Sequence, residues 1–571
     1  MGKSLEVVTT ESAGLELATL ASFVQQASAL QERACNNLRG DLDTEQLQLF
    51  DLALSGAELA ACEVLLGKLS GTQNSLLLAV AQFFIAETLL NQRMRIGARS
   101  FDYSLTSADL EFTVVTGEGR SIGVDEFIAV NLASSSLIAL GDHFKANGGE
   151  PAGAELPDEQ RMIRDSFRAF AQQRVAPIAE RIHREDLTIP DELIDGLREL
   201  GCFGLSVPQR FGGLNPDDGD DSLGMVIVTE ELSRGSLGAA GSLITRPEIL
   251  ARALLEGGTA EQQEHWLPGI ASGATLCAIS VSEPAAGSDV ANVSLRAKRT
   301  AGGWLLNGNK TWCTFAGKAD VLLVLARTDA DAQPPHKGLS LFLVEKPRTD
   351  AHSFEQQQAG GGSLVGKAIP TLGYRGMHSY EMFYDNFFVP DSHLLGGEAG
   401  AGKGFYYTMR GFMGGRLQTA ARATGVMRAA FDAALRHCDD REVFGRSLGE
   451  FGLSQAKLAR MGAYISVCQL FSYAVAEQMD RGGGATAASL VKLLACRLAE
   501  WVTREALQLH GGMGYAEETA VSRYFVDARV LSIFEGAEET LAIRVVGKSL
   551  LADARKRAAQ EAAQPATKSA G

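Results

Sequence analysis

The 571-residue sequence predicts a protein of mixed α and β structure, mainly α-helical and divided into several domains. Three observations support this prediction. The chain is longer than one hydrophobic core usually organises. Apolar residues recur at helical spacing before and after a central region. The central region, residues 275–395, contains instead short runs of β-forming residues separated by turn residues.

The N-terminal region, residues 1–152, is expected to be a mostly helical extension. Its helical patterns, rich in Ala and Leu, end in ANGGEPAGAELPDEQ at 146–160, where Gly and Pro suit a linker. This region shows no catalytic constellation of residues. Packing or control of oligomerisation is therefore its favoured role, with a separate ligand site as the alternative.

Four further regions follow the extension. Residues 153–274 are predicted to form a helical domain, whose first helix begins near Asp158. Residues 275–395 are predicted to form a β-barrel or a sandwich. Residues 396–552 regain long helical periodicity, which favours a helix bundle. Residues 553–571 contain too little apolar surface to pack and are expected to be a disordered tail.

Composition narrows the classes of partner. The formal net charge of −16, from 53 basic and 69 acidic residues, disfavours nonspecific binding to nucleic acid or to anionic lipid. The eight cysteines stand singly, without the paired spacing of a metal site or the density of a disulfide framework. We therefore expect reduced thiols, no metal site and no nucleic-acid partner.

Two segments bear on location. The first residues, MGKSLEVVTTES, lack the apolar stretch of a signal peptide, so export is not expected. The most apolar segment, residues 76–90, is shorter than the roughly 20 residues that span a bilayer, and we interpret it as a buried helix. The sequence thus favours a cytoplasmic protein that does not bind a membrane.

Two segments of the β-rich region have side chains suited to a flat, phosphate-bearing ligand. In VSEPAAGSDV, at 281–290, small residues leave backbone amides accessible to a pyrophosphate, and Ser282 and Ser288 add hydroxyls; a plain turn is the alternative. In NGNKTWCTFAGKAD, at 307–320, an Asn-Gly turn is expected to lead into a strand. Its alternate residues Trp312 and Thr314 then share one side, where they can pack on a heterocycle and hydrogen-bond to it. Core packing is the alternative for Trp312.

Two segments near the C-terminus are informative as a pair. QLHGGMGYAEE, at 508–518, ends a long helix with clustered glycines and by itself reads as a helix cap. IFEGAEET, at 533–540, places Glu535 between an aromatic residue and a glycine. Alone, this glutamate would be an exposed helix charge, like Glu538 and Glu539.

These segments, with GYRGMHSYEMFYDNFFVP and REVFGRSL, occur in the order typical of the acyl-CoA dehydrogenases, which the chain resembles from about residue 155 to 550. The resemblance implies a helical domain, a middle β-barrel domain and a C-terminal four-helix bundle, with FAD at a subunit interface. Within the family, SLITRPEIL at 242–250 and SIFEGAEETL look like the (2S)-methylsuccinyl-CoA dehydrogenases, a group that also carries an N-terminal extension.

The resemblance implies that a proton leaves the α-carbon and a hydride leaves the β-carbon of a CoA thioester. Glu535 is then the base, and partial desolvation beside Ile533 and Phe534 would make it a stronger one. Gly536 would let the substrate run close to the backbone, and the amide of Glu535 would donate to the thioester oxygen. Other members carry the base at the position matching Gly415, where glycine cannot serve.

The resemblance also assigns the cofactor and CoA contacts. Ser282 and Thr314 would hydrogen-bond around the isoalloxazine, Trp312 would pack beside it and Ser288 would lie near the pyrophosphate. The neighbouring subunit would supply Arg441, Phe444, Gln508, Gly511 and Gly512, and Arg416 would lie near the CoA pantetheine. Ordinary surface charges are the alternative for the two arginines.

A second carboxylate on the substrate would need a cation or several donors at the far end of the acyl pocket, because a buried carboxylate without a partner is very costly. Arg246 is the candidate, with Tyr380 or His378 assisting. A surface position beside Pro247 is the alternative for Arg246.

The function expected from these residues is FAD-dependent α,β-dehydrogenation of a short branched dicarboxylyl-CoA, in the first place (2S)-methylsuccinyl-CoA to mesaconyl-CoA. Electrons would pass to an electron-transfer flavoprotein, and the enzyme would be a homodimer. One alternative is an acyl-CoA dehydrogenase or oxidase for another acyl-CoA. Another is a noncatalytic acyl-CoA-binding protein.

Overall fold

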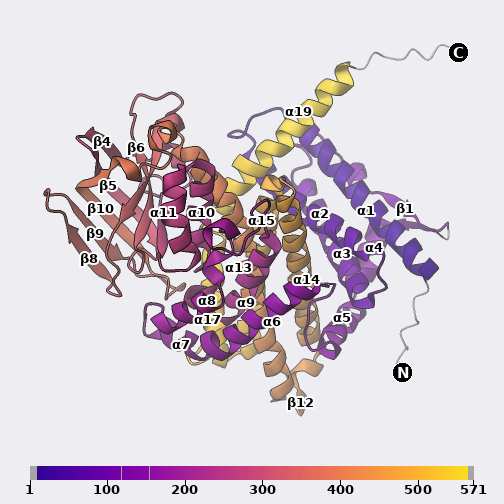
Figure 1. The fold of residues 1–571 in the computed structure, drawn as a ribbon. Coiled ribbons are helices and arrows are strands. Elements are labelled where there is room, and N and C mark those ends of the chain that lie inside the picture. The colour runs from indigo at the N-terminus through magenta and orange to yellow at the C-terminus, as the bar shows by residue number, and fades with distance from the viewer. Residues whose placement is uncertain (1–9, 118, 154, 564–571) are drawn as a thin grey trace.

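The chain folds into a helical centre with a β-sheet on one side and the N-terminal extension on the other (Figure 1). The computed structural model describes residues 10–117, 119–153 and 155–563. The predicted fold class is confirmed: mainly helical, with one β-domain in the middle and extra helices at the N-terminus.

The extension packs three long helices and two shorter ones beside a small hairpin. Its elements are α1 (Thr10–Asn37), α2 (Gln46–Leu69), α3 (Ser75–Ala98), β1 (Thr113–Val115), β2 (Ser121–Gly123), α4 (Val124–Asn131) and α5 (Ser134–Ala146). The apolar segment belongs to α3, which is longer than expected and passes a length and composition test for a membrane span. However, 56% of the most apolar stretch of α3 is buried inside the protein, and Val80 and Ile85 are fully enclosed, as in a core helix.

The helical domain follows a linker. It contains α6 (Asp158–Phe170), a π-helical turn (Ala171–Val175), α7 (Ala176–Arg184), α8 (Asp191–Glu199), α9 (Ser222–Gly235), a second π-helical turn (Leu237–Gly241), α10 (Thr245–Gly257) and α11 (Ala260–Ala271). Helix α9 is buried over most of its length because it packs along α13 (Gly404–Asp440) of the bundle. The two regions therefore share one core.

The middle domain is a single eight-stranded sheet. Its strands are β3 (Cys277–Ser280), β4 (Arg296–Thr300), β5 (Gly303–Thr314), β6 (Val321–Arg327), β7 (Leu339–Glu345), β8 (Ser353–Gln357), β9 (Ser363–Ala368) and β10 (Ser379–Pro390). They run in the order β3-β6-β4-β5-β10-β9-β8, and β7 pairs with β6. The expected Asn-Gly turn is wrong: β5 continues through Gly308, whose φ of +135° accommodates close packing on Leu295.

The C-terminal region is a bundle of long helices. Its elements are α12 (Gly397–Gly400), α13 (Gly404–Asp440), the hairpin β11 (Glu442–Val443) and β12 (Arg446–Ser447), α14 (Gly452–Asp480), α15 (Ala485–His510), α16 (Gly512–Tyr515) and α17 (Ala520–Leu531). The predicted bundle is confirmed, and α13, α14, α15 and α17 form it.

The last helix corrects the prediction of a disordered tail from residue 553. After α18 (Glu538–Thr540) and a π-helical turn (Leu541–Gly547), α19 (Lys548–Ala563) runs past that point and packs along α1 (Figure 1). Leu551 and Ala554 are buried there, and Arg555 donates to the carbonyl of Gly40 at 2.9 Å. The segment has little apolar surface of its own, but the extension supplies a surface to bury it against. Residues 564–571 lie outside the described residues.

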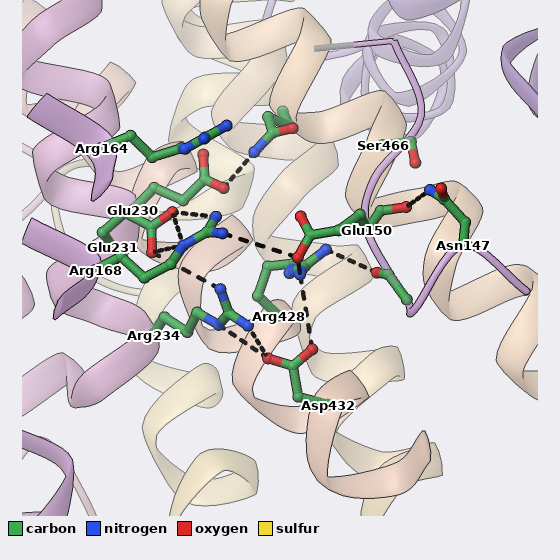
Figure 2. Close-up of polar contacts among 12 residues, drawn as sticks. Asn147, Glu150, Arg164, Arg168, Glu230, Glu231, Arg234, Arg428, Asp432 and Ser466 are labelled. Carbon is green, nitrogen blue, oxygen red and sulfur yellow. Dashed lines mark hydrogen bonds and ion pairs between the residues drawn. The ribbon is translucent and has the colours of Figure 1, made fainter. Parts of the chain in front are cut away.

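Polar contacts fix the extension to the bundle. The Tyr464 hydroxyl donates to Glu87 at 2.6 Å, and the amide of Ala152 donates to the Ser466 hydroxyl at 2.9 Å. In the linker, Glu150 accepts from Arg428 of α13 at 3.0 Å and lies 3.8 Å from Arg168 of α6 (Figure 2). The linker thus joins helices from two other regions.

A second part of this network places two acids side by side on α9. Glu231 pairs with Arg168 at 2.8 Å (Figure 2). Glu230 accepts from Gln469 and from the Tyr473 hydroxyl. Burial, with Glu231 beside it, raises the pKa of Glu230 to about 7. Burial would also raise the pKa of Glu150, but Arg428 and Arg168 hold it below its ordinary value. The stability that Glu230 contributes is therefore lost as pH rises, whereas the stability that Glu150 contributes is lost as pH falls.

Glu230→Gln should remove a pH-dependent loss of stability. The folded pKa of Glu230 lies above its ordinary value of 4.5, so its contribution is fully present below that value and is lost as pH rises through about 7. Between pH 5 and 8, the free energy of unfolding of the wild type should fall relative to Glu230→Gln, measured with denaturant. Glu150→Gln is the matched control: a depressed pKa gives stability that is lost only on acidification below the ordinary value, so its curve should stay parallel to that of the wild type between pH 5 and 8. Parallel pH curves for the three proteins would contradict this account.

Candidate active site

Glu535 lies in a tight turn between α17 and α18. Its φ is +56° and that of Gly536 is +96°, so two successive residues adopt the left-handed region. A glutamate there is strained, and it persists only where the surroundings hold it. Gly536 meets this requirement at the second position, as expected from its lack of a Cβ atom.

Lys492 of α15 holds this turn. Its ammonium donates to the carbonyl of Phe534 at 2.6 Å and to the carbonyl of Gly536, so it bridges the backbone on both sides of Glu535. The residue is 1% exposed, and burial lowers the pKa of Lys492 to about 8. Sequence analysis missed it because a single lysine in a long helix looks like an ordinary solvated charge.

The Glu535 carboxylate is nearly enclosed, with its side chain 8% exposed. Oε1 lies 3.6 Å from the Arg422 guanidinium, and Oε2 is buried without a hydrogen-bond partner among the described residues. A Cβ atom on Gly415 would stand 2.4 Å from Oε2. Glycine at 415 therefore provides the space that the carboxylate fills.

Aromatic packing around Glu535 comes from one neighbour. The Arg422 guanidinium lies over the Phe534 ring, 4.9 Å from the ring centroid. The Tyr374 ring meets the Phe534 ring edge-on, with the two centroids 5.5 Å apart. Ile533, expected to help desolvate the base, is instead 54% exposed. The strained turn directs Ile533 to the surface and Phe534 inward.

Two buried arginines accompany the base. Arg422, on α13, is fully enclosed and has one contact of ordinary length, to the Thr419 hydroxyl at 2.9 Å; its other hydrogen bonds are 3.3 Å or longer. Arg246, on α10, is 6% exposed and donates to the Ser242 carbonyl at 2.9 Å, so the alternative of a surface position for Arg246 is wrong. Burial lowers the pKa of Arg422, Glu535 opposes this and Arg246 adds to it. The sequence signal for Arg422 was its place in a run of small residues, TAARATG.

Nearby charges differ in how far they are already paired. Glu248 is held by Arg252 at 2.8 Å and by Gln418, and burial raises its pKa. Burial lowers the pKa of Arg416, and the charge of Glu535 opposes this shift. The Arg416 guanidinium donates to the Ser489 hydroxyl over a long 3.4 Å. Around the base, positive groups thus exceed the acids available to pair with them.

Tyr380 and His378 lie away from Arg246. The Tyr380 hydroxyl donates to the Ala351 carbonyl at 3.0 Å within the core of the sheet, and His378 Nε2 lies 3.1 Å from Asp186. The tyrosine at the base is Tyr374, whose hydroxyl is buried without a partner among the described residues. Tyr374 lies in the motif segment GYRG, four residues before His378, so the sequence pointed to the right segment but not to this tyrosine.

The residues assigned to the isoalloxazine lie where β3 and β5 end and β10 begins. The amide of Thr311 donates to the Ser282 carbonyl at 2.9 Å, and the Thr314 and Ser379 hydroxyls lie 2.8 Å apart. Trp312 has a φ of +58° and is 57% exposed, because the pairing with β10 skips residues here and forms a β-bulge. The bulge, rather than simple strand alternation, presents the indole.

The residues assigned to a neighbouring subunit lie at one end of the bundle. Arg441 and Phe444 flank β11, and Phe444 is 96% exposed at the hairpin tip. Gln508, Gly511 and Gly512 follow at the end of α15, where the two glycines leave the backbone open to a ligand. The stacked rings of His437 and His510, 4.2 Å apart, join the two segments. Within the described residues, these five residues make no polar contact with the Trp312 group, which consists of Ser282, Trp312 and Thr314. Ser288 is exposed in the loop after β3.

Comparison with known proteins follows the same division. Residues 157–274, 278–387 and 402–551 match the N-terminal, middle and C-terminal domains of acyl-CoA dehydrogenase. The chain is 43% identical over 423 residues to (2S)-methylsuccinyl-CoA dehydrogenase of Cereibacter sphaeroides, covering 73% of this chain and 74% of the relative. The chain belongs to the acyl-CoA dehydrogenase family. The extension lies outside the three matched domains.

Solved structures of this family share the fold. Butyryl-CoA dehydrogenase from Megasphaera elsdenii is similar at 30% identity and a TM-score of 0.63, covering 70% of this chain and 99% of that one. A glutaryl-CoA dehydrogenase from Mycobacterium smegmatis, solved with FADH2, is similar at 27% identity and a TM-score of 0.60, covering 69% and 95%. This acyl-CoA dehydrogenase is an FAD-dependent oxidoreductase acting on acyl-CoA thioesters. The exposed indole of Trp312 and the open backbone at Gly511 and Gly512 fit a flat, phosphate-bearing cofactor.

Gly415→Ala should impair catalysis while leaving the fold intact. The added methyl group would displace the Glu535 carboxylate, and a shift of about 1 Å at a reacting group can cost about 10²-fold in rate. The measurement is the rate of flavin reduction by substrate without oxygen. Gly67→Ala is the matched control, because a Cβ atom there meets nothing within 4 Å in helix α2. Equal rates in wild type and Gly415→Ala would show that Glu535 does not occupy this space during the reaction.

Lys492→Met should lower kcat far more than it raises KM. Without the ammonium, the Phe534 and Gly536 carbonyls lose their donor and the turn that positions Glu535 relaxes, which we expect to reduce kcat by about 10²-fold. Steady-state kinetics at saturating substrate separates the two constants. Lys457→Met is the control, since it removes a bundle lysine that pairs with Glu505 at 2.6 Å. Equal losses in both variants would indicate general destabilisation.

Proposed function

We propose that this acyl-CoA dehydrogenase oxidises a short branched dicarboxylyl-CoA, and that its substrate is (2S)-methylsuccinyl-CoA, converted to mesaconyl-CoA. The observation that carries the proposal is a pair of buried arginines: Arg422 lies 3.6 Å from Glu535, and both Arg422 and Arg246 contact Ser242. Buried cations need anionic partners, and Glu535 alone does not balance them. The similarity to the methylsuccinyl-CoA enzyme of Cereibacter sphaeroides supports the same substrate.

The position of Arg422 suits a short dicarboxylate. In methylsuccinyl-CoA the free carboxylate is bonded to the β-carbon, next to the α-carbon that loses the proton. A cation that binds it must therefore lie close to the base, and Arg422 lies 3.6 Å from Glu535. Its long hydrogen bonds to Ser242, Gln418 and Gly415 leave it able to reorient toward a substrate carboxylate. Arg246 would complete the binding site from α10.

Substrate binding would also change the base. In the free protein, Arg422 and Glu535 face each other. A substrate carboxylate that pairs with Arg422 would draw the guanidinium away from Glu535 and leave the glutamate carboxylate free to face the α-carbon. The enzyme would thus be most reactive with the substrate that supplies the second carboxylate.

The remaining steps use the turn around Glu535. Glu535 would take the α-proton while Lys492 keeps the glutamate in place. FAD, when bound, would supply the acceptor for the hydride that leaves the β-carbon. The amide of Glu535, which has no protein acceptor among the described residues, would donate to the thioester oxygen as negative charge develops there. Arg416 would lie along the CoA chain, and Gly536 would let the acyl group approach the backbone.

FAD would be held by two subunits. Ser282, Trp312 and Thr314 would contact the isoalloxazine and Ser288 the pyrophosphate, whereas Arg441, Phe444, Gln508, Gly511 and Gly512 would come from the second subunit. The exposed Phe444 supports this, since a large apolar residue at a hairpin tip needs a covering surface. We infer a homodimer, because the extension covers α14 and α15 on the other side of the bundle. We also propose electron-transfer flavoprotein as the acceptor, as the family resemblance implies, and a cytoplasmic location, in keeping with eight cysteines that are all free thiols.

The deciding experiment compares substrates that differ only in the second carboxylate. Methylsuccinyl-CoA should bleach the flavin absorbance rapidly without oxygen, and 2-methylbutyryl-CoA, which has a methyl group in place of the carboxylate, slowly. Arg246→Met and Arg422→Met should each lower kcat/KM for methylsuccinyl-CoA by roughly 30-fold or more, about 2 kcal/mol, because a buried charge pair is lost. Their kcat/KM for 2-methylbutyryl-CoA should change little. Glu535→Gln should slow both reactions by about 10²–10⁴-fold.

Arg410→Met is the matched control. Arg410 is an exposed arginine on α13, the helix that carries Arg422, and it pairs with Glu256 at 3.5 Å. Faster bleaching by 2-methylbutyryl-CoA would overturn the dicarboxylate and point to another acyl-CoA dehydrogenase; oxygen consumption without an acceptor would point to an oxidase. A yellow protein that no thioester bleaches would be a noncatalytic binder. Light scattering on the same preparation gives the subunit number, and a tetramer would contradict the dimer.

A further inference from the structure

Three metal-binding side chains meet where the helical domain joins the sheet. Asp186, His352 and His378 each offer one ligand atom, and these atoms lie within 4.8 Å of one another. Asp186 lies in the loop after α7, His352 directly precedes β8 and His378 directly precedes β10. The three segments are far apart in the sequence, and the cluster shares no residue with the site around Glu535.

The contacts within the cluster leave donor atoms available. His378 Nε2 lies 3.1 Å from Asp186 Oδ1, and Arg375 Nε lies 3.5 Å from the same oxygen. In the part of the chain that the structure describes, Asp186 Oδ2 has no polar partner. His352 is exposed, and its ring stands 4.4 Å from the ring of His378.

His378 is the buried member of the cluster. The residue is 7% exposed, and its Nδ1 is buried without a hydrogen-bond partner among the described residues. Burial lowers the pKa of His378, and Asp186 opposes the shift. A neutral imidazole next to a carboxylate is the form in which histidine binds metal ions.

The donor set selects a class of ion. Two imidazole nitrogens and one carboxylate oxygen suit Zn²⁺ and similar divalent transition metals, whereas Mg²⁺ and Ca²⁺ prefer oxygen ligands throughout. Tetrahedral zinc with bond lengths of about 2.0–2.2 Å brings its ligand atoms to about 3.4 Å from one another. The cluster needs only a small contraction, which rotation of the exposed His352 side chain can supply.

We propose that Asp186, His352 and His378 form a site for Zn²⁺ or a similar transition-metal ion, with water completing the coordination. The ion would replace the hydrogen bond between His378 and Asp186 and recruit His352. It would tie the loop after α7 to the starts of β8 and β10. Ser379, which contacts Thr314, follows His378 directly, so the ion would also fix a segment next to the Trp312 group.

Calorimetric titration of the holoenzyme with ZnCl₂ at pH 7.5, after removal of any affinity tag, tests the site. We expect one Zn²⁺ per chain, no binding of Mg²⁺, and at least about tenfold weaker zinc binding in His352→Ala and Asp186→Asn. Zinc should raise the melting temperature of the wild type but not of His352→Ala. Flavin absorbance in each variant reports that the fold is retained.

His265→Ala is the matched control, because it removes an exposed histidine outside the cluster. The eight cysteines are all buried and do not compete for added zinc. Equal zinc binding by the wild type, His352→Ala and Asp186→Asn would place the ion elsewhere and overturn the proposal. The absence of zinc binding by the wild type would overturn it as well.

Discussion

The ammonium of Lys492 is the contact on which the candidate active site depends. It bridges the carbonyls of Phe534 and Gly536, so that Glu535 is held with a positive φ that a glutamate would not otherwise adopt. This conformation sends Phe534 inward under Arg422 and sends the carboxylate into the space left by Gly415. A charge buried in one helix thus orients a base in a loop more than forty residues later in the chain.

Around that base the balance of charge is unequal. Among the residues that the structure describes, Arg246 and Arg422 are buried without carboxylate partners, apart from Glu535 beside Arg422. Proteins rarely bury cations in this way, because desolvation costs more than weak contacts return. A second carboxylate on the substrate resolves the imbalance, which links substrate choice to the same electrostatics that set the strength of the base.

The extension is an integral part of the fold. Its helices share the core of the bundle, its linker places Glu150 between Arg168 and Arg428, and its first helix gives α19 a surface to pack on. Residues 553–563, which have too little apolar surface to fold alone, become ordered for this reason. The bundle face that the extension covers is closed to other subunits, whereas the Phe444 hairpin stays exposed.

Local patterns were enough to predict the helical regions, the β-domain and Glu535, because hydrophobic periodicity and short motifs are properties of neighbouring residues. They were not enough for Arg422, Lys492 or Tyr374, which look like ordinary helix and loop residues until folding encloses them. The Asn307–Gly308 pair led to a wrong prediction of a turn, since strand pairing overrode its turn preference. The sequence by itself determined the family and the fold class, and it singled out Glu535 as the candidate base. Only the tertiary structure decided which charges are buried together, including Asp186 with His352 and His378, because burial and proximity arise from contacts between distant segments.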